Sequence, residues 1–338
     1  MNILYLPHTQ IDKLQWDALI TASEQGQVYA LAWYLDVVAP GWDAVVELDE
    51  AGKYETVMPV PWQRKLGMRY VQQPLYCQQL GIYTLAASIA GATYRQFWAE
   101  VQQRFKYVVG YNFNTGNQLP QQQEQTYTLY LDLGKPYQEL QQHYTRDRKM
   151  NLKRAQKAGL QLLHSQDIAP LIQFFKDETA KRIYGGVSES AYMLLQNLYR
   201  ALQERGLAQL YYTLDAGGRK NAGCLFIVWR NKIVYIFNAA AAHGRKLNGR
   251  TLILDHIIQK YAGQEFILDF ESPDDSEPDI VHFYRSFGPK TMPIPVLKYN
   301  RLPKSIKLAR ELRVRLVKSL KDSIKAFNSC STRLSCFC

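Results

Sequence analysis

The spacing of hydrophobic positions divides roughly the first 135 residues into short helices and strands. Helical periodicity marks residues 11–25, "AWYLDVVA" and "ATYRQFWAEVQQRF". Strand-like runs are "DAVVEL", "YETVMPVPW", "RYVQQPLY", "KYVVGYNF" and "TYTLYLDL". The polar segment "NTGNQLPQQQEQ" is a connection between the last two strands. These elements predict a first mixed domain over residues 1–135.

The following residues predict a second domain over 136–302. Helices are expected at 136–144 and 146–158 and at "PLIQFFKDETAKRI", "SESAYMLLQNLYRALQERG", "TLILDHIIQKYA" and "DIVHFYRSFG". Strands are expected at "GLQLLH", "LAQLYYTLD", "NAGCLFIVW", "KIVYIFNAAA", "EFILDF" and "MPIPVLKY". The turn signals "AGGRK" and "RN" predict that the middle three strands form an antiparallel meander.

This element order is also that of the GNAT acyltransferase fold, and the sequence resembles the FemAB/FemX-like acyltransferases, which carry two GNAT-like domains in tandem. The resemblance lies in "RDRKMNLKRAQKAGL", "IVYIFNAAAAHGRKLNGRTLILDHII" and "FILDFESPDDSEPDIVHFYRSFGPKTMPIPVLKYNRLP". Over the first 130 residues it rests on domain order, "VYALAWYLDVVAPGW" and "QQPLYCQQLGIYT". It implies an α/β (α+β) protein whose two domains each contain a mixed, largely antiparallel sheet flanked by helices.

Most of the chain's positive charge lies in its last segment. Residues 301–338 hold ten Lys or Arg and two acids, so they supply +8 of the net +11 and leave +3 for the rest. Residues 303–338 read as a basic amphipathic helix followed by a loose tail with Cys330, Cys336 and Cys338. This helix can dock on the protein or, through residues 303–327, contact an anionic membrane or RNA.

Composition places the chain among folded proteins. Of its 338 residues, 47% are hydrophobic and 21% charged. No window has the length of apolar sequence that a membrane-spanning helix needs, and "MNILYLPHTQIDK" lacks the pattern of a secretory signal. The five cysteines show neither a disulfide framework nor zinc spacing, so they read as reduced thiols. We expect a cytoplasmic protein, peripheral on the inner face of the membrane if the tail binds lipid.

A run of cations at residues 145–160 predicts an anion site. Lys149, Lys153 and Lys157 form one row, which a solvated helix face explains. Arg146 and Arg148, however, fall in the first helical turn, where the helix dipole favours acids. An anion bound at the helix start accounts for them. The resemblance implies that a basic residue here holds substrate phosphates, with Arg148 preferred over Arg146.

Two further segments are linked to ligands by the resemblance. "HFYRSFG" places Arg285 where relatives carry a cation, which implies a third substrate-binding arginine. "HGRKLNGR" occupies the place of the loop that holds an acyl-donor pyrophosphate in GNAT enzymes, which implies cofactor-binding roles for Arg245, Asn248, Gly249 and Arg250. Only one glycine, Gly249, lies near the place where the usual pattern needs it, and Arg250 would crowd a pantetheine chain. A turn that caps the following helix is the alternative.

The end of "FILDFES" supplies the candidate acids Asp269 and Glu271. A carboxylate there can take a proton from an attacking amine if burial raises its pKa, with Glu271 as the candidate base. Capping of the following loop by both acids is the alternative. Tyr284 can protonate a leaving group, or it can simply pack between Phe283 and Phe287. The six histidines are scattered and no metal motif occurs, so no metal site is expected.

Together these features predict an acyltransferase or aminoacyltransferase that moves an activated acyl group onto an amine. The donor is acyl-CoA or aminoacyl-tRNA, and the residues leave this choice open. The resemblance implies a phosphorylated small-molecule, lipid-linked or cell-envelope-type acceptor, and DNA is not an expected partner. A catalytically degenerate GNAT-fold protein that serves as a binding or scaffold protein at the membrane surface is the alternative.

Overall fold

A computed structural model describes residues 2–119, 124–183, 186–271 and 277–304. Internal contacts divide the chain into two units, Met1–Lys298 and Tyr299–Cys338. Nearly all of the predicted basic helix after Pro303 lies outside the described residues, as do the three terminal cysteines. All of the fold described below therefore concerns the first unit and the end of its last strand.

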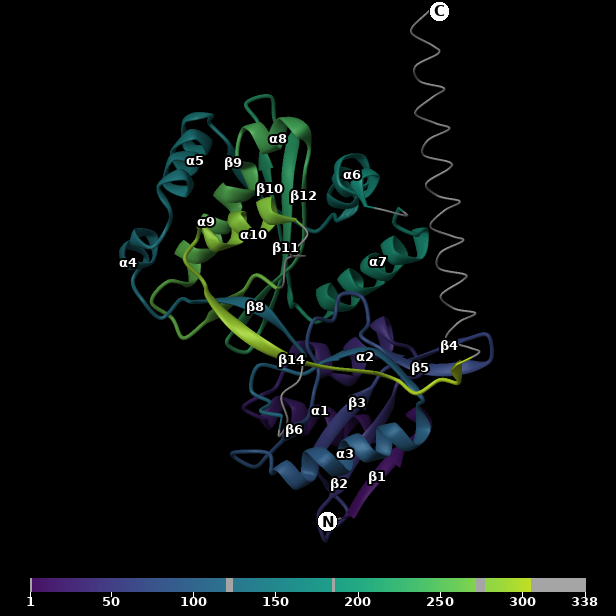
Figure 1. Ribbon diagram of the computed structural model, residues 1–338. Helices are drawn as coiled ribbons and strands as arrows, with labels where there is room; N and C mark the ends of the chain where they lie inside the picture. Colours follow the sequence, from purple (N-terminus) through teal and green to yellow (C-terminus); the bar gives the residue numbers. More distant parts are fainter. Residues whose placement is uncertain (1, 120–123, 184–185, 272–276, 305–338) are drawn as a thin grey trace, which may run out of the picture. The chain divides into compact units, whose positions relative to one another are not determined.

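The N-terminal part of this unit is a small antiparallel sheet with flanking helices (Figure 1). Its strands are β1 (Asn2–Leu6), β2 (Asp43–Leu48), β3 (Tyr54–Val60) and β6 (Tyr83–Thr84), in the order β1-β2-β3-β6. Its helices are the 3-10 helices η1 (His8–Gln10) and η2 (Val28–Ala30) and the α-helices α1 (Lys13–Ala22), α2 (Ala32–Val38) and α3 (Gly91–Arg104). Helix α1 begins at Lys13 because the Asp12 carboxylate accepts hydrogen bonds from the N–H groups of Leu14 and Gln15, both at 3.0 Å.

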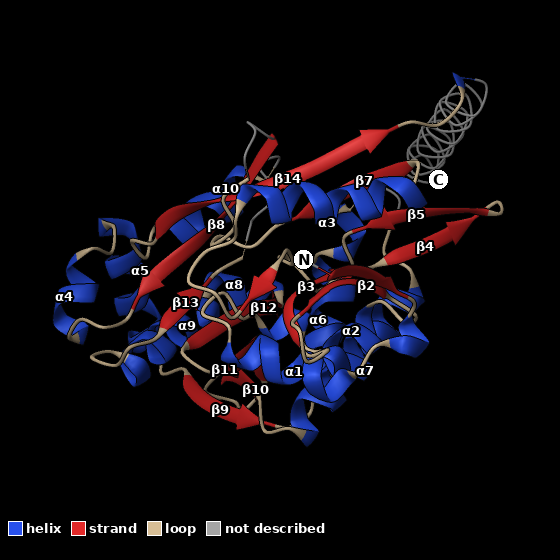
Figure 2. Cartoon of the chain, turned by 90° about the horizontal axis from the view of Figure 1, so that it is seen from below, coloured by secondary structure: helices blue, strands red, loops and turns tan. Residues whose placement is uncertain are grey.

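A second, ten-stranded sheet runs through both predicted domains, and Figure 2 shows β7, β5 and β4 beside the C-terminal end of β14. Its order is β4 (Trp62–Lys65), β5 (Met68–Gln72), β7 (Tyr107–Asn112), β14 (Lys290–Asn300), β8 (Glu124–Asp132), β13 (Ile267–Asp269), β12 (Lys232–Ala240), β11 (Lys220–Trp229), β10 (Ala208–Leu214) and β9 (Gln161–Ser165). Strand β14 pairs antiparallel with β8, so the end of the second predicted domain joins the last strand of the first. The boundaries near residues 135 and 302 stay a prediction.

The C-terminal part contains the predicted meander, and its antiparallel pairing is confirmed by the register of β10, β11 and β12. Its helices are α4 (Tyr137–Gln142), α5 (Arg146–Lys157), α6 (Ala169–Glu178), η3 (Ala180–Arg182), α7 (Glu189–Glu204), α8 (Ala242–Lys246), α9 (Gly249–Tyr261) and α10 (Pro278–Arg285). Gly249 lets α9 start close to the sheet. A Cβ at this position would lie 2.4 Å from Thr213 Oγ1 and 2.8 Å from Ala222 Cβ.

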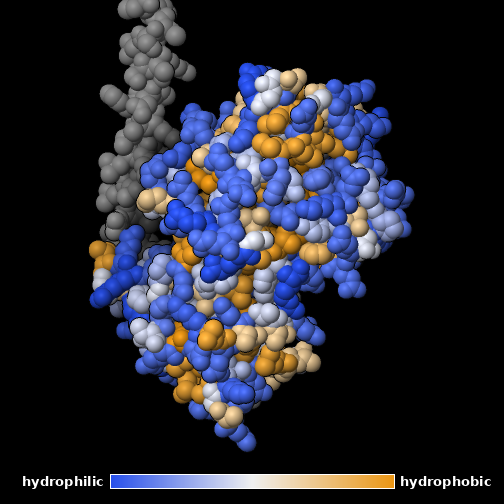
Figure 3. Space-filling model, turned by 180° about the vertical axis from the view of Figure 1, so that it is seen from behind, coloured by the Kyte–Doolittle hydropathy of each residue, from blue (hydrophilic) through white to orange (hydrophobic). Residues whose placement is uncertain are grey.

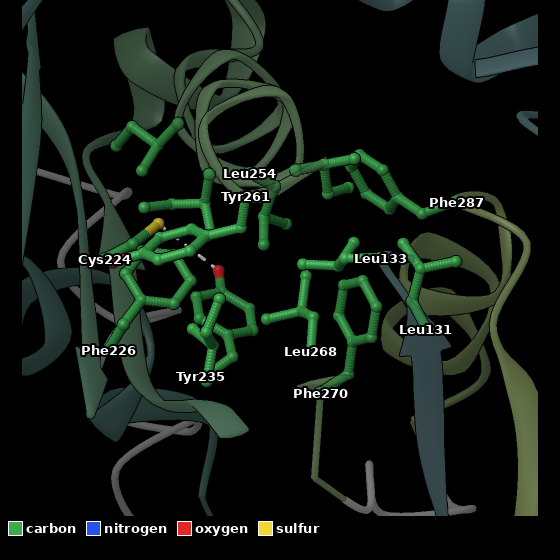
Figure 4. Packing of buried hydrophobic residues seen from close by; sticks show 14 of the residues in the cluster. Leu131, Leu133, Cys224, Phe226, Tyr235, Leu254, Tyr261, Leu268, Phe270 and Phe287 are labelled. Atoms are coloured by element: carbon green, nitrogen blue, oxygen red, sulfur yellow. Dashed lines mark hydrogen bonds between the residues drawn. The ribbon is translucent and has the colours of Figure 1, made fainter. Parts of the chain in front are cut away.

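The core beside the meander is rich in aromatic side chains (Figure 4). Tyr235 stacks on Phe226 with ring centroids 5.1 Å apart, and its hydroxyl lies 3.4 Å from Cys224 Sγ. Leu254 and Tyr261 of α9 cover the same cluster, so the helix and the three strands share one core. This burial fixes the position of β12, whose far end leads into the candidate site.

The face seen in Figure 3 is mostly hydrophilic, with several groups of hydrophobic residues between the polar ones. Large hydrophobic side chains that are exposed come from separate elements, namely Leu4, Leu14, Leu66, Leu75, Leu85, Met150, Ile183 and Met193. None of the helices in the described residues combines the length and the hydropathy required to cross a membrane.

The parallel pairing of β12 and β13 is short. It consists of Lys232–Ile267, Ile233–Leu268 and Val234–Asp269. Strand β12 continues for six residues to Ala240, and within the described part of the chain it has no ladder partner on that side beyond Val234. The two strands therefore separate at Asp269, and in the described residues the backbone groups of β12 beyond Val234 have no ladder partner on this side.

Candidate active site

The turn at the end of β13 is held by Asp269, whose side chain is fully buried. Its Oδ1 accepts hydrogen bonds from Thr128 Oγ1 at 2.5 Å and from the N–H of Glu271 at 2.9 Å. Glu271 has φ = 60°, a left-handed conformation that is uncommon for a residue other than glycine. Asp269 thus stabilises the strained turn from which the Glu271 side chain projects, in keeping with the capping interpretation of Asp269.

The carboxylate of Glu271 meets a side chain from the other end of the unit. Tyr29 lies in η2 and is fully buried. Its hydroxyl donates a hydrogen bond to Glu271 Oε1 at 2.5 Å. Desolvation raises the pKa of Glu271 to about 8; the Tyr29 hydrogen bond lowers it and the charge of Asp269 raises it further. A carboxyl group with this pKa exchanges a proton near neutral pH, which is the property that a general base for an amine requires.

A short hydrogen-bonded chain joins Arg250, Asn238 and Tyr284. Arg250 Nη1 donates to Asn238 Oδ1 at 2.7 Å, and Asn238 Nδ2 donates to the Tyr284 hydroxyl oxygen at 3.2 Å. A guanidinium can only donate, so the amide oxygen of Asn238 must face Arg250 and its NH₂ must face the tyrosine. The oxygen of Tyr284 is therefore an acceptor here, and its own proton is left for another partner.

The groups around Tyr284 act on its pKa in opposite directions. Burial raises its pKa, so the phenol is neutral at physiological pH. The positive charge of Arg250 and the Asn238 hydrogen bond act in the opposite direction, whereas the Glu271 carboxylate raises this pKa. Arg250 and Asn238 would also stabilise the phenolate that forms when Tyr284 loses its proton.

Arg148 is buried at the start of α5, although most arginines are exposed. Its Nε donates to Ser286 Oγ at 2.8 Å and its Nη1 donates to Thr251 Oγ1. Its guanidinium carbon lies 4.3 Å from the ring centroid of Phe283, and that of Arg250 lies 4.8 Å from the same ring. Desolvation, and then repulsion by Arg250, lower the pKa of Arg148 to about 10.

These two arginines carry a charge that nearby acids do not neutralise. Within residues 2–119, 124–183, 186–271 and 277–304, neither Arg148 nor Arg250 forms an ion pair with a carboxylate. Two guanidinium groups on one aromatic ring, without an acid, favour an anion as the missing partner.

The other predicted arginines lie elsewhere. Arg146 is exposed on α5, and Arg285 is exposed on α10 with its guanidinium carbon 5.7 Å from the Tyr127 ring. In the described structure no hydrogen bond or ring contact joins Arg285 to Arg148 or Arg250. The substrate-binding roles of Arg146, Arg148 and Arg285 stay a prediction.

The predicted pyrophosphate loop has local contacts of its own. Arg245 Nη2 forms an ion pair with Glu178, and its Nη1 donates to the Ala240 carbonyl at 3.1 Å. Asn248 adopts a left-handed conformation with φ = 62° just before α9. Gly249 and Arg250 begin that helix, so their backbone N–H groups point toward its N-terminal side. The cofactor-binding roles of these four residues stay a prediction.

The sequence analysis missed Tyr29, Asn238 and the two hydroxyl partners of Arg148. Tyr29 sits in the apolar segment "VYALAWY" and carries no signal of its own. Asn238 does carry one, because it interrupts the otherwise apolar strand "IVYIFNAAA". A half-buried amide in such a strand requires partners, which here are Arg250 and Tyr284.

Comparison with known proteins agrees with the fold described above. Residues 144–275 match the family model described as an acetyltransferase (GNAT) domain. No curated protein matches the chain.

Solved structures show the same fold along most of the chain. FemX matches with a TM-score of 0.62 at 13% identity, covering 89% of this chain and 98% of FemX. A conserved protein of unknown function from Bacteroides thetaiotaomicron VPI-5482 matches with a TM-score of 0.56 at 11% identity, covering 86% and 97%. A tandem GNAT protein from the clavulanic acid biosynthesis pathway matches with a TM-score of 0.50 at 13% identity, covering 90% and 100%. The chain thus has the FemX-like tandem GNAT fold that its sequence indicates, with a GNAT acetyltransferase domain at residues 144–275.

Proposed function

We propose that this protein is an N-acyltransferase that moves an activated acyl group onto an amine of a phosphorylated acceptor. The observation that carries the proposal is the pair Glu271 and Tyr284 beside the split between β12 and β13. One group has a pKa near neutrality, and the other has a hydroxyl proton free to be donated. The GNAT domain at 144–275 supports acyl transfer as the reaction class.

In the proposed reaction, the lone pair of the neutral acceptor amine forms a C–N bond to the activated carbonyl, and the carbonyl π electrons move onto oxygen. The Glu271 carboxylate takes the surplus proton from the attacking nitrogen. Unpaired backbone N–H groups along the free edge of β12 can stabilise this oxyanion. The oxyanion electron pair then re-forms the C=O bond while the C–S or C–O bond to the leaving group breaks, and Tyr284 gives its proton to the departing atom. Asn238 and Arg250 stabilise the resulting phenolate. The proton on Glu271 returns to the Tyr284 phenolate through water, which restores both groups.

The proposed donor is acyl-CoA, with aminoacyl-tRNA as the alternative. The start of α9 offers backbone N–H groups, and Gly249 leaves no side chain in the way of the sheet. Asn248, Gly249 and Arg250 would hold the pyrophosphate of the donor. Arg245 would join them only after releasing Glu178, so its role is the weakest part of this set.

The proposed acceptor carries phosphate, because Arg148 presents a buried positive charge that forms no ion pair among the described residues. The family resemblance adds lipid-linked or cell-envelope precursors as the class of acceptor, and a peripheral position on the inner face of the membrane. Arg146 and Arg285, which are exposed, would contact outer parts of such a molecule. The tail at 303–327, which would touch the membrane, lies outside the described residues apart from its first two positions.

A binding protein without catalysis is the second candidate. The ion pair between Arg245 and Glu178 favours it, since it occupies a side chain expected to contact the donor. In that case the arginines would still bind a phosphorylated ligand, but no acyl group would be transferred.

Thermal shift and turnover separate the candidates. Acetyl-CoA should raise the melting temperature of the wild-type chain, and Arg250→Glu should abolish this shift. Radiolabelled acetyl transfer to a panel of phosphorylated amines should be lost in Glu271→Gln and retained in Glu265→Gln, which changes an exposed acid. Retention of charged tRNA without any response to acetyl-CoA would favour the aminoacyl route. Binding of phosphorylated ligand without turnover would favour the binding protein.

A further inference from the structure

A cavity of about 460 Å³ opens in the N-terminal part of the unit, apart from the residues of the candidate active site. Strands β2, β3 and β6 form one side, and the segment that leads into α3 forms the other. Its polar side chains include four carboxylic acids and two threonines, namely Glu47, Asp49, Glu50, Glu55, Thr56 and Thr84. Lysine and arginine are absent from this lining.

The acids near the opening of the cavity are either solvated or already hydrogen-bonded. Glu50 and Glu55 are exposed, and water can solvate them. One carboxylate oxygen of Asp49 already accepts hydrogen bonds from the N–H groups of Ala51 and Lys53 in a turn, at 2.9 and 2.8 Å. A group of exposed acids gives no reason to expect a ligand.

Glu47 differs, because it lies in the middle of a sheet. It is 7% exposed, belongs to β2, and lines the cavity. Within the described parts of the chain it has neither a hydrogen bond nor an ion pair. Its side chain is therefore available to pair with a cation that enters the cavity.

The neighbouring polar groups do not satisfy Glu47. Thr56 lies directly opposite it in the β2–β3 ladder, but the Thr56 hydroxyl is bonded to that of Thr84 at 3.1 Å. The start of α3 at Gly91 contributes the positive end of a helix dipole, equivalent to roughly half a charge. That partial charge is small against four carboxylates. The cavity therefore keeps a strong negative potential at its base and at its opening.

We propose that this cavity binds a small aliphatic polyamine. One ammonium group pairs with Glu47 at the base of the cavity, and a second pairs with the acids at the opening. A flexible molecule with two or three ammonium groups can reach both places at once. An organic cation fits better than a metal ion, because the described residues include no cluster of three His, Cys, Asp or Glu side chains able to hold a metal. The volume also exceeds what a single ion fills. This site is independent of the acyl-transfer proposal.

Isothermal titration of the full-length protein with spermidine tests the site, with magnesium chloride at equal ionic strength as a charge control. The wild-type chain should bind one spermidine, and magnesium should not displace it stoichiometrically. Glu47→Gln should weaken binding at least tenfold, whereas Glu265→Gln, which alters an exposed acid outside the cavity, should leave it unchanged.

A melting curve for each variant shows whether it folds, so that a loss of spermidine binding can be distinguished from a loss of structure. Without spermidine, Glu47→Gln should melt close to the wild type, since the substitution removes no hydrogen bond or ion pair found among the described residues. If Glu47→Gln fails to fold, Glu55→Gln at the opening takes its place and should weaken spermidine binding severalfold. Absence of binding, or equal affinity in Glu265→Gln and the cavity variants, would overturn the proposal.

Discussion

The hydroxyl of Tyr29 donates a hydrogen bond of 2.5 Å to Oε1 of Glu271, although 242 positions separate the two residues in the chain. The N-terminal part of the protein thereby contacts the proposed base of a site built otherwise from the C-terminal part. The hydrogen bond stabilises the charged form of Glu271 and opposes the effect of desolvation on its pKa. Tyr29 is thus a positioning residue that also tunes the base.

Tyr29→Phe should therefore raise the pKa of Glu271. Loss of one hydrogen bond to a carboxylate is worth about 1.5 kcal/mol, or roughly one pKa unit. The pH dependence of kcat/KM, which should rise through a pKa of about 8 in the wild type, should move upward by that amount. Tyr34→Phe is the control, because the buried hydroxyl of Tyr34 donates to the Tyr76 carbonyl instead. An unmoved profile in Tyr29→Phe would show that Glu271 is not the group that titrates.

The raised pKa of Glu271 also predicts how stability depends on pH. In the unfolded chain this carboxyl titrates near 4.5, and in the folded chain near 8, so between these values the folded state holds more protons. The contribution of Glu271 to the free energy of unfolding therefore falls as pH rises from 4.5 to 8. Below 4.5 it is constant, because both states are protonated.

Glu271→Gln should remove this contribution. Urea unfolding at pH 5, 6, 7 and 8 should show that the variant gains stability relative to the wild type as pH increases. The difference between the two proteins is the useful quantity, because Asp269, whose pKa burial also raises, remains in both. A constant difference over this range would contradict the raised pKa.

Asn238→Asp should reverse the hydrogen bond to Tyr284. The new carboxylate has no N–H to donate, so it would accept the tyrosine proton while still pairing with Arg250. The proton that we propose for the leaving group would then be held by the protein, and the pKa of Tyr284 would rise. We expect kcat to fall at least tenfold with little change in KM.

NMR of protein labelled at tyrosine Cζ gives a readout that does not need the substrate. The Tyr284 resonance, assigned by its loss in Tyr284→Phe, should shift in Asn238→Asp and stay in place in Asn231→Asp, an exposed position in the turn before β12. If kcat falls while this resonance is unmoved, Asn238 acts in another way.

Arg148 and Arg146 form a matched pair for testing the anion site, since they lie two residues apart on α5. Arg148→Met should abolish the thermal stabilisation by pyrophosphate, whereas Arg146→Met should reduce it slightly. Arg148→Met also removes two hydrogen bonds, to Ser286 and Thr251, which should cost about 2 kcal/mol of stability. Equal pyrophosphate responses in the two variants would move the anion site away from Arg148.

The order of the secondary-structure elements was predictable because each has a local pattern. The apolar run "KIVYIFNAAA" predicts β12, and the end of "FILDFES" predicts an acid at a strand terminus, where Glu271 lies. The burial of Arg148 was not predictable, because it depends on Phe283 and Phe287 reaching back to α5 across more than 130 residues.

The sequence likewise does not determine which way Arg285 faces or how the strands of the ten-stranded sheet pair. Helical periodicity places Arg285 on α10 but does not say whether it faces Arg148 or solvent, and it is exposed. The pairing of β14 with β8, which runs the ten-stranded sheet through both predicted domains, depends on register between distant segments. No local pattern carries that information.

Gly249 separates a packing role from a ligand-binding role in the loop before α9. Gly249→Ala should lower stability by about 1–3 kcal/mol, because the added methyl would meet Thr213 Oγ1 and Ala222 Cβ. Gly110→Ala is the control, since the nearest atom to a Cβ there is 3.8 Å away at the end of Lys298. Urea unfolding measures both. If Gly249→Ala keeps its stability but loses the thermal shift with acetyl-CoA, the glycine is needed for the donor rather than for the contact between α9 and the sheet.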